Sequence, residues 1–343
     1  MSNKRQEIGS EFWFEEKLPQ AVSEKDGVYV LSGRTAIDLI LQDILKMRKV
    51  RNVYMPAWCC DSMLAPFLAH GIRVDFYDVR FDGQLKCHTD YTDCTDVFYV
   101  TNYFGYENTL SVETTNRFKE QGAIILYDRT HSFLMENDPY IELADYSFAS
   151  IRKWMGVMGG AVVEGVKSKV SKPYSYLAPK EKAMRMKQAY MSGDDSVDKQ
   201  EFLQLYGEFG HHLAEDYCDY GMDDLSYAIY KTADLSTMKA RRRENAKYLH
   251  EHLNIHFLSP FTPNACPLFV PVFFDTKEER DHVRKKLIEA EIYCPVHWPK
   301  PALIPADFEV NIIYDTELSL ICDQRYSLTD MQRIVDVIVH PDK

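Results

Sequence analysis

The stretch SFASIRKWMGVMGGAVV, residues 147–163, places two cations between apolar side chains. Arg152 and Lys153 stand between Ile151 and Trp154. Apolar neighbours desolvate a lysine, which lowers its pKa and favours the neutral amine. A neutral amine can form a Schiff base with a carbonyl compound. The stretch therefore makes Lys153 a candidate covalent residue, and the alternative is an ordinary surface lysine.

A second motif, LSGRTAID, lies at residues 31–38. A short apolar run ends at Gly33, and Arg34 and Thr35 then open a segment whose apolar residues have helical spacing. The backbone N–H groups and the dipole at such a helix start favour an anion. The motif predicts a phosphate site, although the same residues are also typical of a simple turn and helix cap.

A third motif, IILYDRTHS, lies at residues 124–132. Asp128 ends an apolar run, at the point where open α/β sheets present ligand-binding groups, and His131 follows three residues later. Such a carboxylate can bond a protonated ring nitrogen, and the alternative is an Asp that caps the next turn. A glycine turn, an Asp at a strand end and then Lys153 form the order that an enzyme using pyridoxal 5′-phosphate requires.

Composition and charge exclude several classes of protein. The chain has 343 residues, 45% of them hydrophobic and 27% charged, with a net charge of −12, so a nucleic-acid binder is not expected. The first twenty residues contain no apolar core typical of a signal peptide, and no run is long enough to cross a membrane. Eight cysteines show neither Cys-x-x-Cys pairs nor zinc spacing. We expect a cytoplasmic protein with free thiols, no metal site and no membrane partner.

Apolar runs alternate with helical patterns through the first half of the chain, which predicts an α/β fold with a mostly parallel sheet covered by helices. A charged, helix-rich middle follows at 175–250. The C-terminal part alternates short apolar runs with helices, as in a small α+β domain. We expect a large domain over 1–235, with an N-terminal arm and the helical segment, and a small domain over 236–343. The predicted strands lie at 27–33, 52–55, 72–79, 96–104, 123–128 and 159–163.

Several of these segments together resemble the DegT/DnrJ/EryC1/StrS family of sugar aminotransferases. SGRTAIDLIL resembles the phosphate turn of that family, VTNYFGY its Val-His-x-x-Gly segment and YDRTHS its Asp-Ala-Ala-His-Ser segment. GGAVV resembles the strand after the catalytic lysine, and HWPKP resembles a C-terminal strand on the substrate side. The resemblance spans nearly the whole chain in order. It implies the fold of type I pyridoxal-phosphate enzymes, with pyridoxal 5′-phosphate as the cofactor.

The resemblance also implies roles for individual residues. Lys153 would bind the cofactor as a Schiff base and move protons, Asp128 would pair with the ring nitrogen, and His131 would lie near the phenolic oxygen. The phosphate would be held by Gly33, Arg34, Thr35 and Ser150. Trp58 would cover one face of the ring, and Asn102 stands where the family often has His.

This sequence departs from the family pattern at the lysine. The usual Ser-Phe-x-x-x-Lys spacing, counted from Ser147, places Arg152 in the lysine position, whereas Ser-x-x-Lys counted from Ser150 places Lys153 there. An arginine cannot serve, because its guanidinium stays protonated. On a strand-like path, residues 152 and 153 would face opposite sides. The family also has an aromatic residue where this chain has Cys60.

The resemblance implies a pyridoxal-phosphate-dependent aminotransferase that transfers an amino group from an amino acid, such as glutamate, to a keto-sugar linked to a nucleotide. Two alternatives stay open. One is a sugar dehydratase of the same fold, and the other is a non-catalytic relative that binds a sugar nucleotide. The resemblance and the long charged helices of the middle segment further predict a homodimer.

Overall fold

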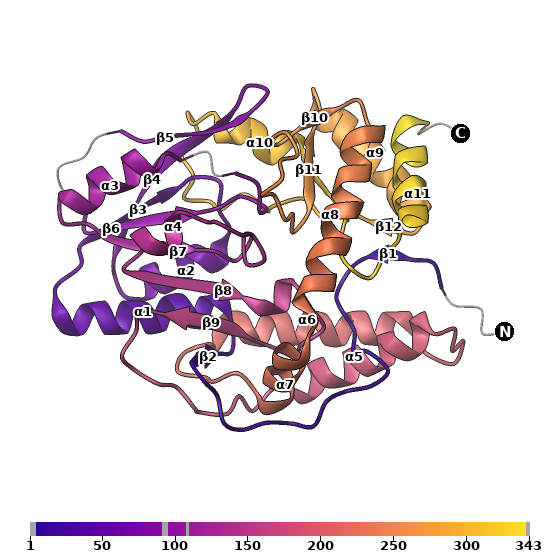
Figure 1. The fold of residues 1–343 in the computed structure, drawn as a ribbon, viewed down its shortest axis with the longest axis horizontal. Helices are drawn as coiled ribbons and strands as arrows, with labels where there is room; N and C mark the ends of the chain where they lie inside the picture. Colours follow the sequence, from indigo (N-terminus) through magenta and orange to yellow (C-terminus); the bar gives the residue numbers. More distant parts are fainter. Residues whose placement is uncertain (1–4, 91–94, 108–109, 341–343) are drawn as a thin grey trace. The chain divides into compact units, whose positions relative to one another are not determined.

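The computed structural model describes residues 5–90, 95–107 and 110–340 (Figure 1). The outermost ends of the two predicted domains, 1–4 and 341–343, lie outside the described residues. The chain divides into two compact units, each built from separate stretches of sequence. The first unit comprises Met1–Glu7, Glu11–Met47 and Phe148–Ala233, and the second comprises Ile8–Ser10, Arg48–Ser147 and Asp234–Lys343.

The first unit combines a short antiparallel pair of strands with long helices. Strand β2 (Val28–Val30) pairs with β9 (Ala161–Glu164), and β8 (Tyr146–Ser150) enters this unit at its carboxyl end. Helices α5 and α6 lie side by side in Figure 1. Aromatic and methionine side chains form the core around these helices, including Phe14, Met184 and Phe202. The helices of this unit are α1 (Gly33–Met47), α5 (Ala178–Met191), α6 (Lys199–Glu215) and α7 (Asp224–Thr232).

The sheet of the second unit is mostly parallel and has the strand order β7-β6-β3-β4-β5. β3 pairs in parallel with both β4 and β6, and β6 pairs in parallel with β7, whereas β5 returns antiparallel to β4. The three central strands β3, β6 and β7 are almost wholly buried, as expected for parallel strands covered on both faces. The elements are β3 (Asn52–Pro56), α2 (Asp61–Ala69), β4 (Arg73–Phe81), β5 (Leu85–His88), β6 (Val97–Thr101), α3 (Val112–Glu120), β7 (Ile124–Asp128) and α4 (Tyr140–Leu143).

The C-terminal part of the second unit is an α+β layer with its own apolar core. Its antiparallel sheet has the order β10-β11-β13, and the N-terminal strand β1 (Ile8–Gly9) pairs in parallel with β12. Helices α8, α9 and α11 bury Ala246, Leu287 and Ile334 against these strands. The elements are α8 (Leu235–His252), β10 (His256–Phe257), β11 (Val270–Phe273), α9 (Lys277–Glu289), β12 (Ile292–Tyr293), α10 (Val310–Thr316), β13 (Glu317–Leu320) and α11 (Leu328–Val339).

Polar side chains fasten the C-terminal part to the parallel sheet within the second unit. The hydroxyl of Tyr314, on α10, accepts the Cys59 N–H at 3.0 Å and lies 2.8 Å from the carbonyl oxygens of Ala57 and Cys59. These backbone groups belong to the turn after β3, and all of them are buried. Because an unpaired buried backbone group is costly, the turn depends on a side chain 255 residues away in sequence.

The predicted α/β class and the mostly parallel sheet are confirmed. The helix-rich middle is also confirmed by α5 to α8, and each of the six predicted strands overlaps an observed one. The division into domains 1–235 and 236–343 stays a prediction, although the chain changes unit at Ala233–Asp234, close to that boundary. No helix in the described part of the chain is both long and apolar enough to span a membrane.

Asp78 on β4 should be a stabilising contact for α10. Its buried carboxylate accepts the N–H groups of Glu309 and Val310 at 3.2 and 3.1 Å, where the helix begins. We expect Asp78→Ala to lower the free energy of unfolding by about 1–2 kcal/mol, the usual effect of losing a helix cap. Urea denaturation measures this change. Asp82→Ala, which removes an exposed ion pair with Lys86, is the control and should change stability by less than about 0.5 kcal/mol. Equal effects of the two substitutions would contradict the assigned role.

Candidate active site

The predicted site residues are divided between the two units. Gly33, Arg34, Thr35, Ser150 and Lys153 belong to the first unit. Trp58, Asn102, Asp128 and His131 belong to the second.

The helix start predicted to bind phosphate is present in the first unit. Ser32 Oγ accepts the Thr35 N–H at 3.2 Å and lies 2.9 Å from Thr35 Oγ1, so Ser32 caps α1. A Cβ atom on Gly33 would lie 3.5 Å from the Cβ of Ser150, which places the helix start against the end of β8. The cap and the anion site are therefore compatible, because the same turn supplies a cap, hydroxyls and the positive end of the helix dipole.

The side chain of Arg34 is held by α6 and the residues after it. Its Nη1 donates to the Leu213 carbonyl at 2.8 Å, and its guanidinium lies 5.3 Å from the centre of the Tyr217 ring. These contacts direct the positive charge toward the C-terminal end of α6. The guanidinium therefore contacts Leu213 and Tyr217, and the backbone N–H is the part of Arg34 that remains at the helix start, where the phosphate is predicted to bind.

The lysine stretch forms a tight turn instead of a continued strand. β8 ends at Ser150, and Ile151–Lys153 is a 3-10 turn in which the Trp154 N–H donates to the Ile151 carbonyl at 2.9 Å. Successive residues of such a turn are rotated by about 120°, since it has three residues per turn. The expected strand-like path is therefore wrong, and Arg152 and Lys153 project in different but not opposite directions. Both side chains are partly buried.

Glu11 is an acidic neighbour of this turn that sequence reasoning missed. Its carboxylate, half-exposed at 51%, is 3.0 Å from the Nζ of buried Lys180. The charge of Lys180, followed by those of Arg152 and Lys153, lowers the pKa of Glu11 to about 2. Burial in turn lowers the pKa of Lys180. Lys153 thus lies within the electrostatic reach of a carboxylate. No feature of the surrounding sequence distinguished this glutamate from its neighbours.

In the second unit, Asp128 is the last residue of β7 and is only 7% exposed. Its Oδ2 accepts the Tyr99 hydroxyl at 2.8 Å, and its Oδ1 accepts the Thr130 N–H at 2.9 Å. Burial, together with the negative charge of Asp128, raises the pKa of Tyr99 well above its usual value, so the phenol keeps its proton. The two donors fix the orientation of a buried carboxylate at the carboxyl end of a parallel strand. The second of them is also the turn cap that the sequence left open as an alternative.

His131 is buried beside this strand end. Its Nδ1 accepts the Phe104 N–H at 3.3 Å, and in the neutral ring this assigns the hydrogen to Nε2. The imidazole packs on Phe104, with ring centres 4.5 Å apart, and stacks on Trp298 at 5.6 Å. The backbone of Phe104 has a positive φ of 60°, which is uncommon for a residue other than glycine.

Trp58 and Asn102 have structural contacts in the second unit. Trp58 is 0% exposed, donates from Nε1 to the His297 carbonyl at 2.7 Å, and stacks on Tyr103 with ring centres 4.7 Å apart. The amide of Asn102 donates to the Tyr106 carbonyl at 2.8 Å and accepts the Gly105 N–H at 3.1 Å, so it fastens the loop after β6. Their predicted contacts with a cofactor stay predictions.

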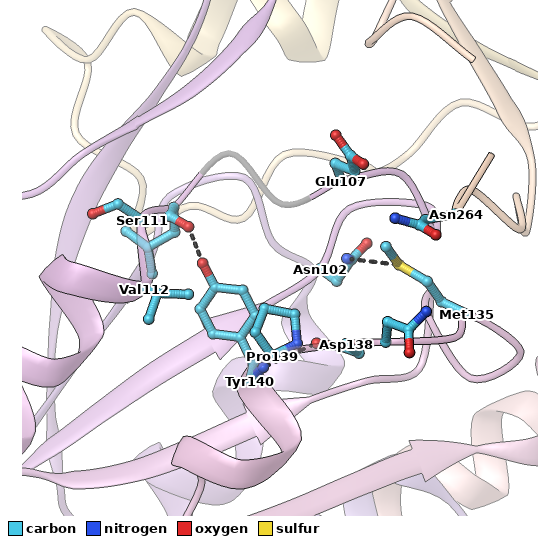
Figure 2. Close-up of a pocket in the computed structure, with 11 residues that line it drawn as sticks. Asn102, Glu107, Ser111, Val112, Met135, Asp138, Pro139, Tyr140 and Asn264 are labelled. Atoms are coloured by element: carbon cyan, nitrogen blue, oxygen red, sulfur yellow. Dashed lines mark hydrogen bonds between the residues drawn. The ribbon is translucent and has the colours of Figure 1, made fainter. Parts of the chain in front are cut away.

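Asn102 also lines a cavity of about 350 Å³ in the second unit (Figure 2). Met135 and Asn264 lie beside it in the close-up, while Tyr140 and Ser111 lie at the other end of the cavity. The nitrogen of Asn102 faces the Met135 sulfur at 3.6 Å. The lining combines the carboxylates of Glu107 and Asp138 with amides, hydroxyls and the apolar side chains of Met135, Val112 and Pro139.

Sequence reasoning also missed a buried polar chain near His131. Glu317, on β13, is 0% exposed and lies 2.5 Å from the Oγ of Ser319, which is 2.8 Å from the Nδ1 of His297. The His297 N–H donates to the second oxygen of Glu317 at 2.7 Å. Burial raises the pKa of Glu317 to about 8. In the sequence, the only indication of these buried polar residues was a single acidic residue at the start of the apolar run ELSLIC.

Among residues 5–90, 95–107 and 110–340, no cluster of three or more His, Cys, Asp or Glu side chains could hold a metal ion.

Solved structures resemble this chain along almost its whole length. The sugar aminotransferase CalS13 from Micromonospora echinospora is 14% identical, with a TM-score of 0.63, and covers 92% of this chain and 87% of its own. NtdA from Bacillus subtilis, solved with bound cofactor PMP, is 15% identical with a TM-score of 0.63, covering 91% and 72%. A DegT DnrJ EryC1 StrS aminotransferase from Brucella abortus is 15% identical with a TM-score of 0.61, covering 91% and 84%. This chain has the fold of these aminotransferases.

The fold implied by the sequence resemblance is thereby confirmed. No family model and no curated protein matches the chain. At such low identities the shared property is the fold, while the side chains of the site have to be judged from their own chemistry.

Glu317 should make stability depend on pH. Its pKa is about 8 in the folded protein and about 4.5 when unfolded, so the folded state binds more protons between these values. The free energy of unfolding should therefore fall as the pH rises through this window, by at most about 1.4 kcal/mol per pH unit from this group. Urea denaturation from pH 5.5 to 8.5 should show this decline in the wild type relative to Glu317→Gln. Glu251→Gln, at an exposed position of α8, is the control. Parallel curves for wild type and Glu317→Gln would contradict the assignment.

Proposed function

We propose that this chain is a pyridoxal-phosphate-dependent aminotransferase that transfers an amino group from an amino acid to a keto-sugar linked to a nucleotide. The fold supports this proposal, because similar structures are named as sugar aminotransferases and one holds PMP, the amino form of the cofactor. The observation that carries it is the buried carboxylate of Asp128 at the end of β7.

The donor set of Asp128 fits the ring nitrogen of the cofactor. Its partners Tyr99 and Thr130 are neutral donors that hold the carboxylate in place. A carboxylate with this support stabilises a protonated pyridine nitrogen, since an opposite charge favours the charged form. The raised pKa of Tyr99 keeps the neighbouring phenol a donor. Asp128 is therefore proposed to bind the ring nitrogen, and His131 is proposed to lie near the phenolic oxygen.

The helix start fits the phosphate. Gly33 and Thr35 would supply N–H groups and a hydroxyl, Ser150 would add a hydroxyl, and Arg34 would contribute through its backbone N–H, since its guanidinium contacts Leu213 and Tyr217. When bound, the cofactor supplies an aldehyde and an electron sink. Lys153 is proposed to bind the aldehyde carbon and then to move the proton of the amino acid, and Glu11 to balance the positive charge around it.

Side-chain chemistry favours Lys153 over the alternative register. Arg152 cannot act as the nucleophile, and the Nε of Arg152 has no hydrogen-bond partner in the described part of the chain. We further propose that the protein is a homodimer in solution and acts on soluble sugar-nucleotide and amino-acid substrates. A non-catalytic relative that binds a sugar nucleotide is the alternative that the next experiment excludes or supports.

Pyridoxal phosphate followed by borohydride should label Lys153. Reduction fixes the cofactor to the amine that holds it, and peptide mapping by mass spectrometry then identifies the residue. The double variant Arg152→Lys/Lys153→Arg, which keeps the charge and the composition, is the matched control and should lose the label at position 153. A specific label at another lysine would move the site. A colourless wild-type protein without a stable label would support the non-catalytic relative.

Asp128→Asn should impair the reaction far more than the fold. The amide keeps an acceptor for Thr130 but removes the charge that stabilises the ring nitrogen. We expect the half-reaction with L-glutamate to slow by about 10- to 100-fold, since a hydrogen bond to a charged group is worth about 1.5–3 kcal/mol. Asp145→Asn is the control, because Asp145 accepts the Ile125 N–H near the other end of the same strand. An unchanged rate in Asp128→Asn, with a melting temperature equal to that of the wild type, would remove Asp128 from this role.

A further inference from the structure

A carboxyl group, a hydroxyl and an imidazole form a buried chain in the second unit. Ser319 Oγ lies 2.5 Å from Glu317 Oε1 and 2.8 Å from His297 Nδ1. Glu317 Oε2 accepts the backbone N–H of His297 at 2.7 Å, which fixes the position of the carboxyl group relative to the imidazole. All three residues are buried. The three side chains are therefore held in hydrogen-bond contact with one another in a fixed order.

The hydrogen-bonded series of Glu317, Ser319 and His297 has two complete arrangements of its hydrogens. When Glu317 is ionised, the Ser319 hydroxyl donates to the carboxylate and its oxygen accepts the Nδ1–H of His297, which leaves a lone pair on Nε2. When Glu317 is protonated, its O–H donates to Ser319, and the Ser319 hydroxyl donates to Nδ1, which places the hydrogen on Nε2. The imidazole is neutral in both arrangements, and the second holds one more proton than the first, on the carboxyl group of Glu317.

We propose that Glu317, Ser319 and His297 form a proton relay that switches His297 Nε2 between proton acceptor and proton donor. Nε2 takes a proton from a donor, Nδ1 passes its proton to Ser319, and Ser319 passes its own to Glu317. The reverse sequence returns the proton. One proton enters and is stored on the carboxyl group, so no imidazolium has to persist among apolar side chains.

The surroundings of His297 place the relay beside the candidate active site. The ring of His297 lies 5.2 Å from that of Phe104, 4.9 Å from that of Phe269 and 6.3 Å from that of His131. Nδ1 of His131 accepts the Phe104 N–H, so His131 presents a hydrogen on Nε2. The role of the relay in catalysis rests on the proposed function, because His131 belongs to that site. Glu317 and Ser319 act through His297 and are positioning residues.

The charged groups around the relay allow both states near neutral pH. Arg280, on α9, donates from Nη1 to the backbone carbonyl of Glu317 at 2.9 Å and forms an ion pair with Asp281. Burial raises the pKa of Glu317 to about 8, and Arg280 opposes this increase. Cys294 lies nearby, and burial raises its pKa to about 12, so this thiol stays neutral. The carboxyl group of Glu317 thus titrates in the mildly alkaline range.

Nitrogen NMR of the cofactor-free protein, labelled with ¹⁵N-histidine, tests the relay directly. The His297 signals are assigned by their loss in His297→Gln, and the protonated nitrogen is followed from pH 6.5 to 9.5. In the wild type, the hydrogen should move from Nε2 to Nδ1 with a midpoint near pH 8. In Glu317→Gln it should stay on Nε2, because the amide donates as the protonated acid does. Ser319→Ala should abolish the change, and Ser319→Thr should restore it.

The matched control is Ser226→Ala, which removes a buried serine hydroxyl that accepts the Met158 N–H in the first unit. This variant should leave the His297 signals as in the wild type. A His297 tautomer that does not change with pH in the wild type, or that still changes in Glu317→Gln, overturns the relay. Because the measurement uses no cofactor and no substrate, a failed relay leaves the labelling of Lys153 to decide the proposed function, and a failed labelling leaves the relay intact.

Discussion

Parallel pairing of β3, β6 and β7 is the constraint on which the second unit depends. In a parallel sheet the carboxyl ends of all strands meet at one edge, and the register pairs Thr101 directly with Asp128. The residues that follow β3 and β6, and the last residue of β7, are thereby brought to this edge. Trp58, Asn102 and Asp128 lie there although they are far apart in the sequence. The position of Asp128 is a property of the sheet and needs no special local sequence.

Each polar group that is buried at this edge requires a hydrogen-bond partner, because burying it without one is costly. Asp128 is held by Tyr99 and Thr130, and the amide of Asn102 is held by its own loop. The carboxyl group of Glu317 is satisfied in the same way by Ser319 and His297. These bonds fix the side chains in single orientations before any ligand arrives. Such preorganisation is what a site for charged or reacting groups requires.

The sequence predicts most of the strands and the strand-end aspartate, because both depend on local patterns of apolar residues. The helix start at Gly33 is predicted for the same reason. The path of Arg152 and Lys153 is not predicted, since an apolar neighbourhood suits a strand and a tight turn equally, and only the structure shows the 3-10 turn after β8.

Residues that act through long-range contacts are hidden for a different reason. Glu317 looks like an ordinary polar residue at the start of a strand, and only the arrival of residues around His297 buries it. Glu11 is likewise one of several acidic residues in its segment, and its distinction comes from Lys180. Arg34 was expected to face a phosphate because of its position in the motif. The carbonyl of Leu213, far away in the sequence, decides where its guanidinium lies.

The hydroxyl of Tyr314 has a consequence for how the chain is made. A ribosome adds about 5–20 residues per second, so the turn after β3 leaves the ribosome well before Tyr314 is even synthesised. During this interval its buried backbone groups have no partner from α10. The N-terminal strand β1 waits still longer for β12. The second unit therefore completes its folding only after α10 and β12 have been synthesised.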